Sequence, residues 1–112
     1  MAVLDGSHLS IADLVEGSDS HPVFVMFHSP HCGHCQLAKP AFFEAAGEMA
    51  GSPFRFVAFD CSVNPGGAAR ERVGGYPTFR LYGGSRVTEY AGDRSTLSFV
   101  RWLCSTCGLC GD

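Results

Sequence analysis

The sequence is poor in positive charge and in long apolar runs. Of its 112 residues, eight are Lys or Arg and 11 are Asp or Glu, so the formal net charge is -3, and Lys39 is the single lysine. A chain with this balance has no basic face to attract nucleic acid or anionic lipid. No stretch reaches the roughly 20 apolar residues of a membrane-spanning helix, and residues 1–5 lack the basic and apolar parts of a secretory signal. We therefore expect a soluble chain that has neither nucleic acid nor a membrane as its partner.

The apolar content is sufficient for one packed domain. Hydrophobic residues make up 46% of the chain and charged residues 17%, and nine residues are Phe. Intrinsic disorder needs the opposite balance, with few aromatics and a high net charge. The length matches a single domain, and we find no linker, repeat or low-complexity tract.

Strand patterns and helix patterns alternate along the chain. We predict strands near residues 3–4, 22–27, 54–59, 78–82 and 86–90, and helices near 10–15, 33–50, 64–73 and from about 95. Residues 22–27 and 54–59 are almost continuously apolar, which is typical of strands buried on both faces. The order βαβαβαββα implies parallel pairing at first and a closing antiparallel hairpin in the same sheet. The predicted fold class is α/β, a mixed central sheet flanked by helices.

Apolar spacing predicts which helix faces are buried. In helix 33–50, which contains Pro40, the expected buried positions are Ala38, Phe42, Ala45, Ala46 and Met49. In the last helix they are Leu97, Val100 and Leu103, with Phe99 and Trp102 alongside. The phenylalanines at 24, 27, 42, 43, 54, 56, 59, 79 and 99 are expected to be chiefly core.

The six cysteines are unevenly grouped. Cys32 and Cys35 form a close pair, Cys61 stands alone, and the last three lie near the end of the chain at Cys104, Cys107 and Cys110. Close pairs suggest reactive or metal-binding thiols rather than long-range disulfides. Cys61 follows a predicted strand, and free cysteine is commonly a small buried residue.

The segment Cys32-Gly33-His34-Cys35 places two thiols one helical turn apart, between a buried strand and a helix. At a helix N-terminus, unpaired backbone N–H groups and the helix dipole favour the Cys32 thiolate. An exposed thiolate can attack a disulfide, and a shielded second thiol can then resolve the mixed disulfide. We predict that Cys32 attacks and Cys35 resolves, and that His34 makes their disulfide a better oxidant.

Several segments together resemble the catalytic, a-type domain of protein disulfide isomerases, members of the thioredoxin superfamily. The resemblance is carried by Phe27–Cys35, Lys39–Pro40, Asp60–Cys61, Gly75–Phe79 and Tyr90–Gly92. It extends from about Val3 to Leu103, so we predict a catalytic domain at 1–103 and a cysteine-containing tail at 104–112. It implies a thioredoxin-like fold, a cis bond before Pro77, and no metal or organic cofactor.

The same resemblance implies an activity and a set of partners. Formation and rearrangement of disulfides in protein substrates are favoured over reduction, because cytosolic thioredoxins usually carry Gly-Pro where this chain has Gly33-His34. The partners would be protein or peptide thiols and disulfides, with glutathione or a partner oxidase. The compartment would be the endoplasmic reticulum lumen or another oxidising secretory compartment.

Residue roles also follow from the resemblance. The loop at Pro77 would hold the substrate chain, Tyr76 and His31 would contact it, and Arg94 would stabilise the Cys35 thiolate transiently. His31 is a departure, since the family usually has Trp there. Met26 is a second departure, since the family has a buried acid there that takes the proton of the resolving cysteine. We expect a slower or more pH-dependent resolving step, with His28, His31 and Arg94 as candidates to compensate.

Other interpretations stay open. The domain could act as a thioredoxin-like disulfide reductase, or as a redox-inactive binding module, although such modules usually lack one of the two cysteines. Cys32 and Cys35 have the spacing of zinc ligands, and three nearby histidines could join them: His28, His31 and His34. The group Cys104, Cys107 and Cys110 could be an auxiliary dithiol that exchanges electrons with the pair, part of a metal site, or a tail without chemical role.

Overall fold

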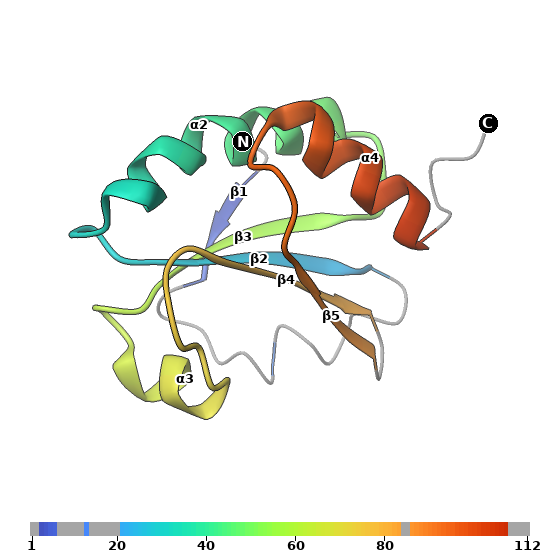
Figure 1. Ribbon diagram of the computed structural model, residues 1–112. Coiled ribbons are helices and arrows are strands. Elements are labelled where there is room, and N and C mark those ends of the chain that lie inside the picture. The colour runs from blue at the N-terminus through green and yellow to red at the C-terminus, as the bar shows by residue number, and fades with distance from the viewer. Residues whose placement is uncertain (1–2, 7–12, 14–20, 84–85, 108–112) are drawn as a thin grey trace.

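The computed structural model describes residues 3–6, 13, 21–83 and 86–107. The elements are β1 (Val3–Asp5), β2 (Val23–His28), α2 (Gly33–Glu48), β3 (Arg55–Asp60), α3 (Pro65–Arg70), β4 (Thr78–Gly83), β5 (Arg86–Tyr90) and α4 (Thr96–Cys107), shown in Figure 1. The strands and helices predicted within this part of the chain are present. The helix predicted near 10–15 lies outside the described residues except for Asp13.

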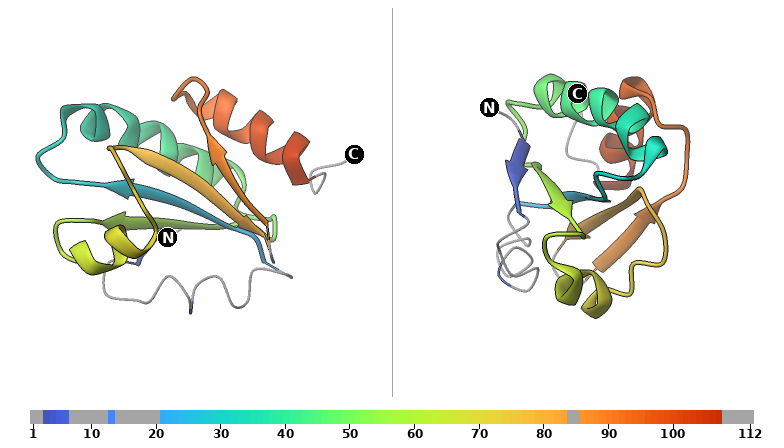
Figure 2. Two further views of the ribbon diagram at one scale, coloured as in Figure 1. Left: turned by 60° about the horizontal axis from the view of Figure 1, so that its bottom comes forward. Right: turned by 90° about the vertical axis from the view of Figure 1, so that its left-hand side faces the viewer.

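The five strands form one mixed sheet in the order β1-β3-β2-β4-β5. Strands β1 and β2 both run parallel to β3, whereas β4 is antiparallel to β2 and to β5. All six residues of β2 are buried, as expected for the central strand of a two-sided sheet. Helices α2 and α4 cover one face and α3 lies on the other (Figures 1 and 2), so the predicted α/β fold is confirmed.

The alternation of side chains along β2 divides the core into two layers. Phe24 and Met26 belong to the layer beneath α2 and α4. Val23, Val25 and Phe27 belong to the layer on the α3 side. The predicted buried face of α2 is confirmed by the burial of Ala38, Phe42, Ala45, Ala46 and Met49.

Two expected details are wrong, the burial of Leu97 and the end of α3, and the phenylalanines are chiefly core with Phe43 as the exception. Leu97 is 58% exposed, because Phe99 and Leu103 turn toward the sheet and a residue two positions away lies about 200° around the helix. Phe43 is 42% exposed, although its ring still lies 6.3 Å from that of its buried neighbour Phe42. Helix α3 ends at Arg70 rather than near residue 73, and Arg72 has a positive φ of 57°, which a right-handed helix does not accommodate.

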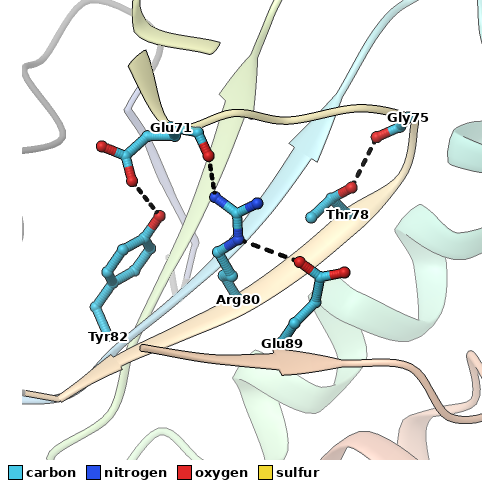
Figure 3. Close-up of polar contacts among 6 residues, drawn as sticks. All are labelled: Glu71, Gly75, Thr78, Arg80, Tyr82 and Glu89. Atoms are coloured by element: carbon cyan, nitrogen blue, oxygen red, sulfur yellow. Dashed lines mark hydrogen bonds and ion pairs between the residues drawn. The ribbon is translucent and has the colours of Figure 1, made fainter. Parts of the chain in front are cut away.

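The loop between α3 and β4 is tied at both of its ends (Figure 3). The Thr78 hydroxyl donates to the Gly75 carbonyl oxygen at 2.7 Å. Arg80 Nη1 donates to the Glu71 carbonyl oxygen, also at 2.7 Å, and the Tyr82 hydroxyl donates to the Glu71 carboxylate at 2.7 Å. These contacts connect the segment that precedes β4 to the sheet, so they fix where residues 76–77 lie.

None of the helices in the described part of the chain is long and apolar enough to cross a membrane.

Candidate active site

The two close cysteines lie where β2 ends and α2 begins. Cys32 is the N-cap of α2, and its Sγ accepts a hydrogen bond from the Cys35 backbone N–H at 3.4 Å. The Cys32 thiol also donates to the Tyr76 carbonyl oxygen at 3.4 Å. The Tyr76–Pro77 peptide bond is cis, which confirms that prediction. The site therefore joins a strand end, a helix start and a loop more than 40 residues further along the chain.

Cys32 is partly exposed and its surroundings favour the thiolate. Its pKa is lowered chiefly by the hydrogen bond from the Cys35 side chain. Partial burial acts in the opposite direction, while the backbone N–H groups of Cys35 and His34 and the charge of Arg94 lower the pKa further. Because a helix N-terminus supplies these N–H groups, the helix itself helps to activate the thiol.

Cys35 has the opposite environment. Its side chain is fully buried, and burial raises its pKa to about 11. The hydrogen bond to Cys32 raises the pKa as well, whereas a backbone hydrogen bond from Ser29 and the charge of Lys39 lower it. The two thiols therefore differ both in access and in acidity, as predicted from their positions.

We expect the reaction of Cys32 with iodoacetamide to have a midpoint pH below that of an ordinary free thiol, since its pKa is lowered. At pH 7 a larger fraction of Cys32 is thiolate than in an unfolded chain, so it alkylates first. In a Cys35→Ala chain the midpoint should rise, because the largest stabilising hydrogen bond is removed. The measurement is alkylation followed by peptide mass mapping at each pH. An unchanged midpoint in Cys35→Ala would contradict this assignment.

The remaining predicted residues surround the pair at different depths. His31, His34 and Arg94 are exposed, and Tyr76 is 40% exposed while Pro77 is buried. The His31 backbone N–H donates to the Ser29 hydroxyl at 3.4 Å. The charge of Arg94 acts on Cys32. The resemblance assigns Arg94 to Cys35 instead, and that role stays a prediction.

One neighbour of the pair, Lys39, was not singled out as a site residue from the sequence. Lys39 follows Cys35 by one helical turn and is half-buried. Its charge lowers the pKa of Cys35 and contributes to lowering that of His28. The i, i+4 spacing after the second cysteine could have indicated Lys39, but its burial depends on the packing of α2.

Cys61 is buried, as predicted, and is 3% exposed. Burial is the largest cause of its raised pKa, and the Tyr76 side chain hydrogen-bonds it. Its buried thiol is therefore poorly suited to attack an external disulfide.

Cys104 lies far from the pair. It lines a pocket with Glu48 and Met49 at the carboxyl end of α2, whereas Cys32 and Cys35 lie at the amino end. The 16 residues of α2 span about 24 Å at 1.5 Å per residue. In Figures 1 and 2 the start of α2 and the end of α4 lie at opposite ends of the molecule. The structure therefore does not bring Cys104 next to Cys32 and Cys35.

Helix α4 continues through Cys107, so the expected boundary between residues 103 and 104 falls inside a helix. Cys104 is disulfide-bonded and packs against the core layer beneath α2 and α4. Cys110 lies outside the described residues. The auxiliary dithiol of Cys104, Cys107 and Cys110 stays a prediction, and from its position in the structure Cys104 could exchange electrons with the pair only through a second molecule or a large rearrangement.

Within the described ranges, no group of three or more His, Cys, Asp and Glu side chains is placed to hold a metal ion.

Comparison with known proteins agrees with this geometry. Residues 11–105 match the thioredoxin family model. The chain is 31% identical over 93 residues to a protein disulfide-isomerase of Drosophila melanogaster, and 34% identical over 100 residues to protein disulfide-isomerase A5 of Bos taurus. These alignments cover 81% and 86% of this chain but only 19% of each relative. The chain thus spans about a fifth of the length of the curated relatives it matches.

Solved structures give the same result for the fold. The J-Trx1 fragment of ERdj5 superposes with a TM-score of 0.84 and 25% identity over 94% of this chain and 51% of that one. The first thioredoxin domain of mouse protein disulfide-isomerase A4 superposes with a TM-score of 0.75 and 24% identity over 93% of this chain and 73% of that one.

The chain belongs to the thioredoxin family. Within that family it is similar to protein disulfide-isomerases, so the resemblance found in the sequence is confirmed.

Proposed function

We propose that this chain is a thiol–disulfide oxidoreductase that forms and rearranges disulfides in protein substrates. The observation that carries the proposal is the contrast within one pair of thiols. Cys32 is partly exposed with a lowered pKa, and Cys35 is fully buried with a raised one. Curated relatives named protein disulfide-isomerases support the same activity.

In this proposal, Cys32 is the nucleophile and Cys35 the resolving thiol. In reduction or rearrangement, the Cys32 thiolate attacks one sulfur of a substrate disulfide and the other substrate sulfur leaves as a thiolate. Cys35 then attacks Cys32 Sγ, which releases the bound substrate sulfur and leaves a Cys32–Cys35 disulfide. In disulfide formation the same steps run in reverse, and the oxidised pair accepts two electrons from substrate thiols.

The surface beside Cys32 suits an extended, partly unfolded chain. Tyr76 exposes apolar area, and its carbonyl oxygen, which accepts from the Cys32 thiol, could pair with a substrate backbone N–H. His31 adds an exposed imidazole that can contact the substrate, and the loop that contains the cis Tyr76–Pro77 bond lies beside the Cys32 thiol. Glutathione or a partner oxidase would renew the disulfide, and an oxidising secretory compartment would supply such partners.

The test is equilibration of the chain in graded glutathione buffers, followed by alkylation and mass mapping of all six cysteines. We expect the Cys32–Cys35 disulfide to form with a reduction potential on the order of −180 mV, the range of an oxidase or isomerase. A potential near −270 mV would favour the alternative, a thioredoxin-like reductase. If Cys32 and Cys35 form no disulfide in any buffer, both the oxidase or isomerase assignment and the reductase assignment are contradicted.

A further inference from the structure

The resolving step requires a proton acceptor, and the position expected to supply one is apolar. The proton of Cys35 is held tightly, since burial raises the pKa of that thiol to about 11. Met26 lies in the same core layer as Cys35 and is fully buried. Its register partner on β3 is Ala58, so neither residue of this cross-strand pair can take a proton.

The next residue of β2 on the same face is His28. Successive side chains of a strand alternate between faces, so His28 points to the α2 side, as Phe24 and Met26 do. It is 7% exposed, and its Nδ1 is a buried side-chain atom for which the described residues provide no hydrogen-bond partner. Buried polar atoms without a partner are uncommon, and each calls for an explanation.

Ser29 and Lys39 link the surroundings of His28 to those of Cys35. The backbone of Ser29, the residue after His28, hydrogen-bonds the Cys35 thiol. The charge of Lys39 on α2 acts on both His28 and Cys35. The chain thus brings an unpartnered imidazole nitrogen and the buried thiol to the same end of the sheet.

The charged groups around His28 come from three elements. Lys39 approaches from α2, Asp60 from the paired position on β3, and Asp5 from β1. Burial is the largest cause that lowers the pKa of His28, followed by Lys39, while Asp60 and Asp5 act in the opposite direction. The imidazole is therefore neutral at pH 7, the form that can accept a proton, and two carboxylates stabilise its protonated form.

We propose that His28 is the proton acceptor of Cys35 in the resolving step, directly or through one water, in place of a carboxyl group at residue 26. This inference rests on the proposed function, since it concerns one step of the exchange reaction. Lys39 has a positioning role, because its charge favours the thiolate of Cys35 and the neutral form of His28.

The step balances without a further reagent. Before it, Cys32 Sγ is bonded to a substrate sulfur and Cys35 carries its proton. As this proton passes to His28, an electron pair on the Cys35 sulfur attacks Cys32 Sγ. The bond between Cys32 Sγ and the substrate sulfur then breaks. The substrate leaves as a thiolate, and the His28 imidazolium returns its proton to that thiolate or to solvent.

The test uses the full chain with Cys32 and Cys35 reduced, mixed with substoichiometric 5,5′-dithiobis(2-nitrobenzoate). Attack by Cys32 releases one thionitrobenzoate, and resolution by Cys35 releases the second, so the two absorbance phases separate the two steps. We expect a second phase that is independent of protein concentration. Its rate should rise with pH through a value below 6.5, the ordinary pKa of histidine, and then level off.

His28→Phe and His28→Gln should slow the second phase about a hundredfold at pH 7 and leave the first phase in place. Without an internal base, the rate should instead rise about tenfold per pH unit, because hydroxide must remove the proton. Met26→Glu in the His28→Gln chain should restore a fast second phase. His21→Gln, which replaces an exposed imidazole at the far end of β2, should behave as the wild type.

Two results would overturn the inference while leaving the proposed function intact. One is a second phase whose rate and pH dependence in both His28 variants equal those of the wild type. The other is a slower second phase that still levels off as in the wild type, which would indicate a purely structural role. If the wild-type chain itself releases no second thionitrobenzoate, the proposed function fails, and this inference fails with it.

Discussion

A Cys32→Ser chain is expected to lose disulfide exchange by a factor on the order of a thousand or more. The reason is that no other described thiol can replace Cys32. Cys35 is fully buried, and at a pKa of about 11 only about one molecule in ten thousand carries its thiolate at pH 7. The measurement is the rate of exchange with a fluorescent peptide disulfide, which reports cleavage directly.

The matched control is Cys61→Ser. Cys61 is also a free thiol, but it is 3% exposed and burial raises its pKa. Its replacement by a similar small side chain should leave the exchange rate within about twofold of the wild type. An active Cys32→Ser chain, or an inactive but folded Cys61→Ser chain, would show that the nucleophile is assigned to the wrong cysteine.

Phe24→Ala should produce the largest loss of stability, about 3–5 kcal/mol of unfolding free energy. Phe24 is fully buried on the central strand. Its ring lies within 6.4 Å, centroid to centroid, of six other aromatic rings: Phe42, Phe56, Phe79, Tyr90, Phe99 and Trp102. These rings come from α2, β3, β4, β5 and α4, so one truncation leaves a cavity where five elements meet. Urea unfolding monitored by tryptophan fluorescence measures the loss.

Phe43→Ala removes the same side chain from a site that is 42% exposed on α2. We expect it to cost about 1 kcal/mol or less, because much of that ring already contacts water. The comparison keeps the chemical change constant and varies only burial. Equal losses in the two variants would contradict the assignment of Phe24 to the centre of the core.

Local pattern was sufficient to predict the strands, most helix bounds and the contrast within the cysteine pair. The apolar run at 22–27 favours a buried strand, and a cysteine at the start of the helix that follows it meets the backbone N–H groups of that helix. The helix stripe from Ala38 to Met49 follows from the 3.6-residue period alone. The same period wrongly placed Leu97 on the buried face, because the last helix has apolar residues on more than one side and only contact with the sheet selects among them.

The sequence by itself thus determined the fold, the reactive pair and the order in which its two thiols act in the proposed mechanism. Only the tertiary structure decided what surrounds that pair. How the helices pack onto the sheet sets the burial of His28 and the effect of the Lys39 charge on Cys35 and His28. It also sets the separation of Cys104 from Cys32. The physical reason is that hydrogen bonding and side-chain period act over a few residues, whereas burial and distance between remote segments are set by packing of the whole chain.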